Sequence, residues 1–325
     1  MFERVNKRWT HDEEGNRCLN FVLNGKSLCC KVIATGGTKS IIDLGDGNVI
    51  GVIRGFGNSI SFGNIVDREI NSSEKLRGLG LKVLDCKKIE IKFIDDEQSV
   101  PALLMPSFAY LAENGKQVRD HKNPDSSSGK TFIFGSKDNL KSIDYWRMIF
   151  SCIKDDLALC VINQLSLKYD TVNLMIEDSN NAKLMHENSL SSKVFTELQQ
   201  KLHLFFFDFS DTNYLSGKDK LPFITSNGIA DDESIQQYVQ TLYDYVLCAI
   251  FGGVSDAEYK LIMGKDSFFN TNDLEKESNE FLHQAWGEVV AYVANKTKSH
   301  IDNMPAKEKF ETYSVISKNQ FSFSK

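Results

Sequence analysis

Two oxygen-bearing side chains, Asn173 and Asp208, stand beside apolar runs that are typical of buried strands. Asn173 opens the run Asn-Leu-Met-Ile, and Asp208 follows three consecutive phenylalanines. Amide and carboxylate oxygens are hard ligands suited to Mg²⁺. A carboxylate behind three aromatic rings is costly if it stays unpaired, so Asp208 invites a cation as its partner. Both residues also have an ordinary alternative, because Asn and Asp are common in the turns that follow strands.

The first third of the chain has the pattern of short β-strands joined by tight turns. Apolar and β-branched stretches end at glycine-rich turns, among them Gly36-Gly37 and Asp46-Gly47. A later stretch has apolar residues at helical spacing and ends at Gly78. The pattern predicts five strands at residues 28–34, 40–44, 49–54, 88–94 and 100–105, and one helix at 64–77.

The rest of the chain is predicted to be mainly helical, with one strand-like interruption at residues 202–209. A polar stretch at 113–130 is rich in turn formers and indicates an exposed loop. The predicted helices cover residues 143–165, 233–251 and 273–295. We therefore expect a β-rich region over 1–108, a hinge and polar loop over 109–141, and a helical region over 142–325.

Short sequences around Arg54, Glu69, Asn173 and Asp208 resemble, in the same order, the signatures of the protein-kinase superfamily. Arg54 ends Val-Ile-Gly-Val-Ile-Arg, which resembles V-A-I-K with arginine in place of lysine. The run Phe-Phe-Phe-Asp-Phe-Ser at 205–210 resembles the strand that leads into D-F-G. The chain is thus similar to a divergent kinase of the secreted bacterial effector type. The resemblance implies an α+β, two-lobed protein-kinase-like fold. Its N-lobe would be an antiparallel five-stranded sheet with one helix, and its C-lobe would be mainly helical.

The same resemblance implies how ATP would be held in the cleft between the lobes. Arg54 would pair with Glu69 and grip the phosphates, with Glu74 as a competing acid. Adenine would lie against the connection at residues 103–107. The nucleotide-binding residues implied in this way are Arg54, Glu69, Gly36, Gly37 and Met105. Solvated charges and a plain hairpin turn remain the alternatives for these positions.

Asn173 and Asp208 would hold Mg²⁺ or Mn²⁺ in such a site. The family places a catalytic aspartate five residues before the asparagine, and this chain has Lys168 there. Asp170 would then orient the acceptor hydroxyl, and Lys168 would neutralise the transferring phosphoryl group. A structural role for Asp170 is the alternative.

The resemblance implies metal-dependent transfer of the γ-phosphate of ATP to a serine or threonine of a protein substrate. Two further enzymes are compatible with the same residues, a small-molecule kinase and a nucleotidyl transferase. A pseudokinase scaffold, which binds nucleotide without transfer, is the alternative from another class. Lys168 favours the scaffold, whereas Asn173 and Asp208 favour the enzyme.

Composition limits the other classes of function. The 325 residues carry 38 Lys+Arg and 44 Asp+Glu, a net charge of −6, which argues against nucleic acid as a partner. The seven cysteines form an odd set without a C-x-x-C pair, as in reducing compartments. The sequence shows neither a secretory signal nor a transmembrane run, so we expect a cytosolic protein or, for a bacterial effector, one that acts in the host cytosol.

A cluster of cations follows the predicted helix. Acids at Glu74, Asp85 and Glu90 are interspersed with it, so a solvated face is one interpretation. A site for a polyanionic regulator such as an inositol phosphate is the other. The cations are Lys75, Arg77, Lys82, Lys87, Lys88 and Lys92.

Overall fold

The structure is a computed structural model that describes residues 8–36, 38–54, 59–118, 142–165, 167, 172–177, 202–207, 223–251 and 276–309. The chain divides into two compact units. The first comprises Met1–Asn114 with Phe207–Thr212, and the second comprises Gly115–Phe206 with Asn213–Lys325.

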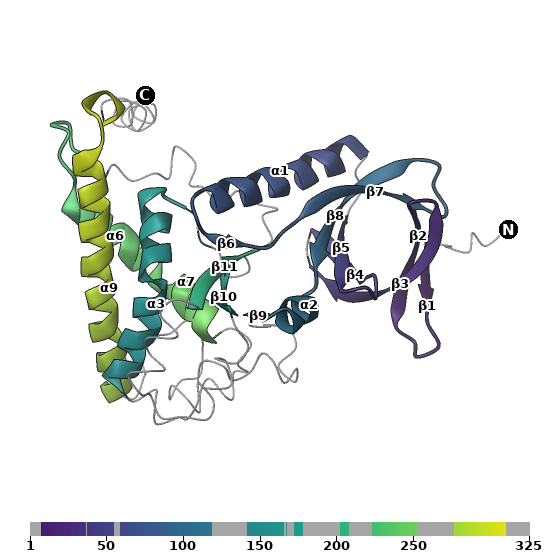
Figure 1. The fold of residues 1–325 in the computed structure, drawn as a ribbon, viewed down its shortest axis with the longest axis horizontal. Coiled ribbons are helices and arrows are strands. Elements are labelled where there is room, and N and C mark those ends of the chain that lie inside the picture. Colours follow the sequence, from purple (N-terminus) through teal and green to yellow (C-terminus); the bar gives the residue numbers. More distant parts are fainter. Residues whose placement is uncertain are drawn as a thin grey trace, which may run out of the picture. The chain divides into compact units, whose positions relative to one another are not determined.

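A closed antiparallel β-barrel forms most of the first unit (Figure 1). Strands β2, β3, β4, β5, β8 and β7 pair in that order, and β7 pairs again with β2, while β1 adds to the outside of β2. The short strand β6 follows the helix of this unit. The strands are β1 Trp9–His11, β2 Arg17–Leu23, β3 Lys26–Thr35, β4 Lys39–Asp43, β5 Asn48–Ile53, β6 Lys82–Val83, β7 Lys87–Phe93 and β8 Ser99–Pro106.

The barrel corrects the predicted five-stranded lobe of a kinase-like fold, although the protein is still a mixture of α and β structure. All five predicted strands are present, but β2 pairs with β3 on one side and with β7 on the other. The closing contacts are Phe21 with Phe93 and Val22 with Lys92. Because both sheet edges are now paired, the two-lobed protein-kinase-like fold with an open sheet is wrong for this unit.

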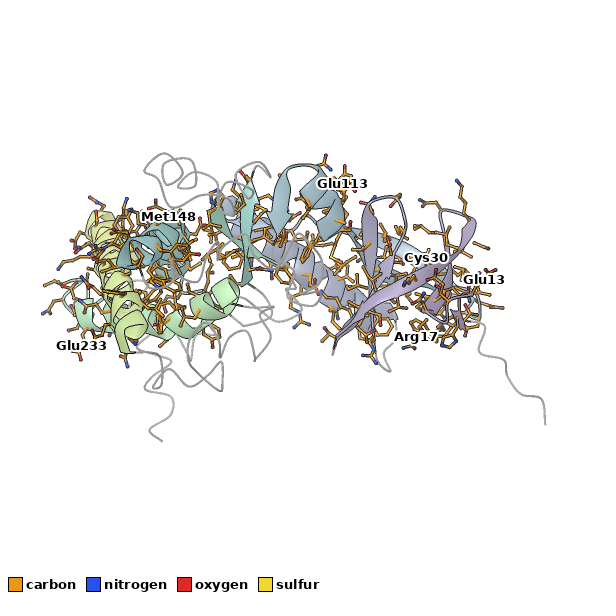
Figure 2. All side chains as sticks on the ribbon, turned by 90° about the horizontal axis from the view of Figure 1, so that it is seen from below. Glu13, Arg17, Cys30, Glu113, Met148 and Glu233 are labelled. Atoms are coloured by element: carbon orange, nitrogen blue, oxygen red, sulfur yellow. The ribbon has the colours of Figure 1, made fainter. Side chains whose placement is uncertain are left out.

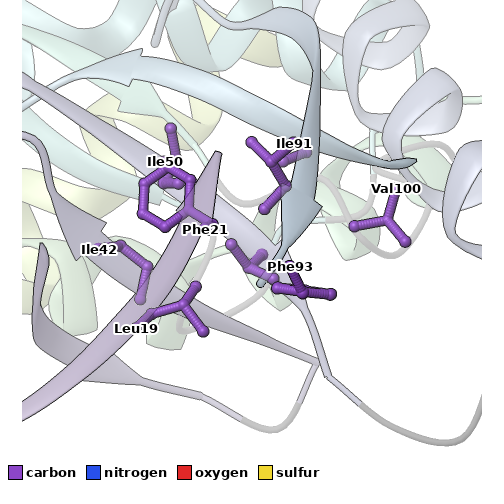
Figure 3. Packing of buried hydrophobic residues seen from close by; sticks show 9 residues of the cluster. Leu19, Phe21, Ile42, Ile50, Ile91, Phe93 and Val100 are labelled. Carbon is purple, nitrogen blue, oxygen red and sulfur yellow. The ribbon is translucent and has the colours of Figure 1, made fainter. Parts of the chain in front are cut away.

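Alternating side chains fill the barrel (Figure 3). Large aliphatic and aromatic groups from all six strands meet inside it, and burial of such groups is the main favourable contribution to folding. Cys30 of β3, labelled in Figure 2, is partly buried against the same cluster. The fully buried members are Leu19, Phe21, Ile42, Ile50, Val52, Ile91, Phe93, Val100 and Ala102.

Helix α1, Ser59–Gly78, packs against β8 and β7 on the outer side of the sheet. It starts earlier than the predicted helix and ends at the predicted glycine. Its buried stripe recurs at helical spacing and consists of Val66, Glu69, Ser72, Ser73 and Leu76. An acid, Glu69, therefore occupies a position where a core residue is expected.

The short helix α2, Phe108–Glu113, begins at Ser107, whose hydroxyl accepts the Tyr110 N–H at 3.0 Å. The Ser107 N–H donates to the carbonyl of Gly47 in the β4–β5 turn at 2.9 Å. The Tyr110 ring lies directly over Gly47. The predicted Asp46-Gly47 turn therefore also contacts the start of α2, the helix that follows β8.

The second unit combines a small antiparallel sheet, in the order β11-β10-β9, with four helices among its described residues. Helix α9 packs along α3 and α6, and the Trp286 ring contacts the rings of Phe150 and Tyr243. The elements are β9 Lys116–Val118, α3 Ile143–Ile162, β10 Val172–Glu177, β11 Leu202–Phe206, α6 Asp232–Thr241, α7 Tyr243–Phe251 and α9 Lys276–Asn303.

Two predicted segments can be compared with the structure, the helix at 233–251 and the hinge and loop at 109–141. The helix predicted at 233–251 is two helices, α6 and α7, which meet at Leu242. Of the predicted hinge and loop over 109–141, the described part contains α2 and β9, and residues 119–141 lie outside the described residues. In the described part of the chain, no helix has the combined length and hydrophobicity that crossing a membrane requires.

We predict that Gly47→Ala lowers the free energy of unfolding by about 1–3 kcal/mol, because φ at Gly47 is +85° and a Cβ there would lie 2.5 Å from Cδ2 of Tyr110. Urea denaturation measures the change. Gly78→Ala is the matched control, since a Cβ on this last residue of α1 meets no atom within 4 Å. We expect that variant to be neutral or stabilised by up to about 1 kcal/mol. Equal changes in the free energy of unfolding for the two variants would contradict the prediction that residue 47 must be glycine for the turn to pack under Tyr110.

Candidate functional site

A buried ion pair joins the barrel to α1. Nζ of Lys39, the first residue of β4, lies 2.6 Å and 2.7 Å from the two carboxylate oxygens of Glu69. The exposed fraction is 5% for Lys39 and 2% for Glu69. Both oxygens of the acid are directed at one ammonium group, so the carboxylate fixes the position of this cation.

The register of the sheet places Lys39 on the outer side of the barrel wall. Lys39 lies opposite Ile53, whereas the next residue, Ser40, lies opposite Val52 of the barrel core. Side chains alternate between the two faces of a strand, so Lys39 and Ile53 point away from that core. This is the side on which α1 packs, and Glu69 reaches the ammonium from its buried stripe.

Gly51 leaves room for the aliphatic part of Lys39. A Cβ at this position would lie 3.5 Å from Cδ of Lys39, 3.2 Å from Cε of Met105 and 3.5 Å from Cβ of Leu103. The lysine stem therefore passes over the glycine between apolar neighbours from β8. Apolar surroundings lower the local dielectric, which strengthens the attraction between the paired charges and raises the cost of leaving either one alone.

Arg54, the predicted partner of Glu69, makes a different contact. Its Nη1 donates to the Gly36 carbonyl at 2.7 Å, and its backbone N–H donates to the Thr38 carbonyl at 2.8 Å. The predicted Arg54–Glu69 pair is wrong, because Glu69 binds Lys39. Alternation is the reason: Arg54 directly follows Ile53, the residue that shares its face with Lys39, so its side chain leaves the strand on the other side.

The remaining predicted nucleotide residues are partly described. Gly36 closes the β3–β4 connection by donating its N–H to the Lys39 carbonyl at 2.9 Å, and Gly37 lies outside the described residues. Met105 is buried in β8, where it lies opposite Val49. The segment expected to be a connection is therefore mostly strand. Glu74, the competing acid, is exposed.

Of the predicted metal and catalytic residues, only Asn173 is among those described. It is fully buried in β10 opposite Phe205 of β11, and its Oδ1 accepts the N–H of Leu174 at 2.7 Å. Asp208, Lys168 and Asp170 lie outside the described residues. Within the described ranges, no group of three or more His, Cys, Asp or Glu side chains is arranged to hold a metal ion.

A second buried acid, Asp156 of α3, was not singled out in the sequence. Its Oδ2 accepts the backbone N–H of Leu204 at 2.8 Å and lies 3.6 Å from Nδ1 of His203. Both partners belong to β11. Asp156 falls on the side of α3 that also carries the buried Ile153 and Cys160, and helical spacing could have identified it as an acid on an apolar face.

The cation cluster contains exposed ion pairs. Nη2 of Arg77 lies 2.6 Å from Oδ1 of Asp85, and Nζ of Lys88 lies 2.8 Å from Oδ1 of Asp67. These carboxylates neutralise two of the six cations. A site for a polyanionic regulator remains a prediction.

Comparison with protein-family models finds no match, and comparison with curated proteins finds none either. Among solved structures, the chain is similar to the Helicobacter pylori proinflammatory kinase CtkA. The two chains are 11% identical, and the match covers 85% of this chain and 98% of that chain with a TM-score of 0.28. A TM-score of this size does not establish a shared fold, so the functional argument depends on the residues of the site.

We predict that Lys39→Met lowers the free energy of unfolding by about 3–5 kcal/mol, because it leaves the Glu69 carboxylate buried without its ammonium partner. Adding Glu69→Leu removes that charge as well, and we expect the double variant to regain most of the stability. Chemical denaturation of the three proteins measures both effects.

Lys88→Met is the matched control for this prediction. It breaks an ion pair whose side chains are 40% and 51% exposed, and we expect a loss below about 1 kcal/mol. Two outcomes would contradict the prediction that buried Glu69 needs Lys39 as its partner. In one, Lys39→Met is as stable as Lys88→Met. In the other, the double variant is as unstable as Lys39→Met alone.

Proposed function

We propose that the protein is an ATP-dependent phosphotransferase, an atypical kinase that transfers the γ-phosphate of ATP to a serine or threonine hydroxyl of a protein. The observation that carries the proposal is the buried pair between Lys39 on a strand and Glu69 on the adjoining helix. In protein kinases, an ion pair between a strand lysine and a helix glutamate orients the lysine toward the ATP phosphates.

Energetics support a functional reason for this pair. Two charges lose their hydration when they are buried, and well-packed apolar residues of similar size commonly give equal or greater stability. A chain selected for stability alone could therefore place apolar residues at both positions. Retention of the pair is accounted for if the ammonium group is needed at a fixed position for an anionic ligand such as the phosphates of ATP.

The metal of this reaction, Mg²⁺ or Mn²⁺, would be held by Asn173 and Asp208. The donor set, an amide oxygen and a carboxylate, fits a hard cation. When bound, the metal supplies charge neutralisation at the phosphates. Lys39 would bind the nucleotide phosphates, and Glu69 would hold Lys39 in place.

The transfer itself needs an acceptor oxygen in line with the bond that breaks. The hydroxyl oxygen forms a bond to the γ-phosphorus while the bond from that phosphorus to the bridging β–γ oxygen breaks, and ADP leaves. We assign Asp170 to orient the hydroxyl and receive its proton, and Lys168 to neutralise the transferring group.

The test is transfer of label from ATP carrying radioactive γ-phosphate to a generic protein acceptor, with Mg²⁺ or Mn²⁺. We expect transfer by the wild type, and loss of at least about 100-fold in the Lys39→Met/Glu69→Leu double variant, which removes the phosphate cation while keeping the fold. Lys88→Met, which removes an exposed cation outside the proposed site, is the control. Equal activity of the double variant and the wild type would show that Lys39 is not the phosphate-binding cation.

The same assay separates the alternatives. A pseudokinase scaffold is favoured by Lys168 at the position of the family's catalytic aspartate. It would bind ATP, seen as a rise in the thermal midpoint, without transferring label under any metal condition. Label transferred only from α-labelled ATP indicates nucleotidyl transfer. Label recovered only on small molecules of a cell extract indicates a small-molecule kinase.

A further inference from the structure

Strand β5 has a glycine where a residue that favours strands is expected. Gly51 lies between Val49-Ile50 and Val52-Ile53, so its neighbours on both sides are β-branched. Such residues pack well on a pleated sheet, whereas glycine weakens the interior of a strand, because it has no side chain to pack and loses more conformational entropy on folding. A glycine inside a strand therefore indicates either a special backbone conformation or the close approach of another group.

The backbone of Gly51 does not require glycine. Its φ lies outside the left-handed region that favours this residue. Gly51 also pairs in register with Ile41 of β4 and with Leu103 of β8. A residue with a side chain could adopt the same conformation, so the space next to residue 51 must account for the glycine.

The Lys39 side chain occupies this space. Gly51 lies opposite Ile41, which is two residues after Lys39 on β4. Lys39 is therefore a diagonal neighbour of Gly51 on the same face of the sheet. A Cβ at residue 51 would lie 3.5 Å from Cδ of Lys39, which is an ordinary contact for a single carbon. The two Cγ atoms of a valine would extend beyond that Cβ toward the lysine stem.

The other neighbours of residue 51 leave little room for adjustment. A Cβ there would lie 3.5 Å from Cβ of Leu103, an atom whose place is set by the β8 backbone, and 3.2 Å from Cε of Met105. The end of Met105 is flexible, but this residue is only 6% exposed and has little space to move into. A side chain larger than alanine at residue 51 would therefore displace the lysine stem.

Displacement of the stem changes the position of the charge. Nζ of Lys39 is two bonds beyond Cδ, and it lies 2.6 Å and 2.7 Å from the two carboxylate oxygens of Glu69. A shift of Nζ by about 1 Å is enough to take at least one of these contacts beyond hydrogen-bond distance. The ammonium group would then no longer be held by both oxygens of the acid.

We propose that Gly51 is a positioning residue for phosphate binding: the missing side chain lets the Lys39 stem cross β5, and this sets the place at which the ammonium group meets the phosphates of ATP. The inference rests on the proposed function, in which Lys39 binds these phosphates. All the residues involved belong to the first unit. A displacement of about 1 Å in a positioned group can lower a rate 100-fold, so a small shift of this cation has a measurable effect.

Gly51→Val and Gly78→Val form the matched pair for the first test. Both add the same side chain to a glycine of the first unit, but a Cβ at Gly78 meets no atom within 4 Å. We expect Gly51→Val to raise the Kd for ATP with Mg²⁺ by about 10-fold or more, measured by calorimetry well below the thermal midpoint. Gly78→Val should bind ATP as the wild type does, and Gly51→Ala should lie between the wild type and Gly51→Val.

Stability gives a second readout, which does not depend on ATP. Gly51→Val is introduced into the wild type and into Lys39→Ala/Glu69→Leu, a background that lacks both the lysine stem and the acid that binds it. We expect the decrease in the urea midpoint caused by the valine to be at most about half as large in this background, because the space of the stem is then free. A Gly51→Val chain that folds only in this background gives the same answer.

Two results would overturn the proposal. One is a Gly51→Val protein with the same Kd for ATP as the wild type. The other is a valine effect of equal size in the two backgrounds, or failure to fold in both, because residue 51 would then act without Lys39.

Failure of the proposed function has a different signature. A wild-type protein that binds no ATP with either metal overturns the phosphotransferase, and with it the role of Gly51 in phosphate binding. The comparison of the two backgrounds then still decides whether Gly51 positions Lys39.

Discussion

The buried pair of Lys39 and Glu69 is the interaction on which the first unit depends. Glu69 belongs to the stripe by which α1 packs, so the helix can bury that stripe only where the carboxylate meets the ammonium. Apolar contacts alone allow a helix to slide over a sheet at small cost, whereas a buried charge without its partner costs several kcal/mol. The pair therefore sets the register of α1 as well as the position of the lysine.

The closed barrel fixes the backbone of the strand that carries Lys39. Lys39 begins β4, which lies between β3 and β5, so its backbone is bonded on both sides. Closure by β2 extends that support around the whole sheet, because no barrel strand depends on a single neighbour. Gly51 then leaves space for the aliphatic part of the lysine side chain, since a larger residue at this position would press against that side chain and against Met105.

Local sequence patterns predicted the strands and the helix of the first unit, but they could not predict closure. In β2, Cys18, Leu19, Phe21, Val22 and Leu23 do not alternate strictly with polar residues, and its pairing with β7 joins residues about seventy positions apart. The predicted partner of Glu69 was wrong for a related reason. Arg54 was chosen because Val-Ile-Gly-Val-Ile-Arg resembles V-A-I-K, whereas the pairing of Glu69 depends on which face Arg54 and Lys39 take in the paired sheet.

Asp156 shows why a charged run along the sequence is a poor guide to burial. Lys154, Asp155 and Asp156 are consecutive charges that suggest a solvated turn of helix, yet Asp156 reaches the backbone of β11 while Asp155 stays exposed. Both buried acids of the described structure discussed above, Glu69 and Asp156, accept from a donor on a neighbouring strand. Each can therefore fix the relative position of a helix and a strand, which apolar packing leaves less sharply defined. A catalytic site built from separate strands needs that definition, because a displacement of about 1 Å can lower a rate 100-fold.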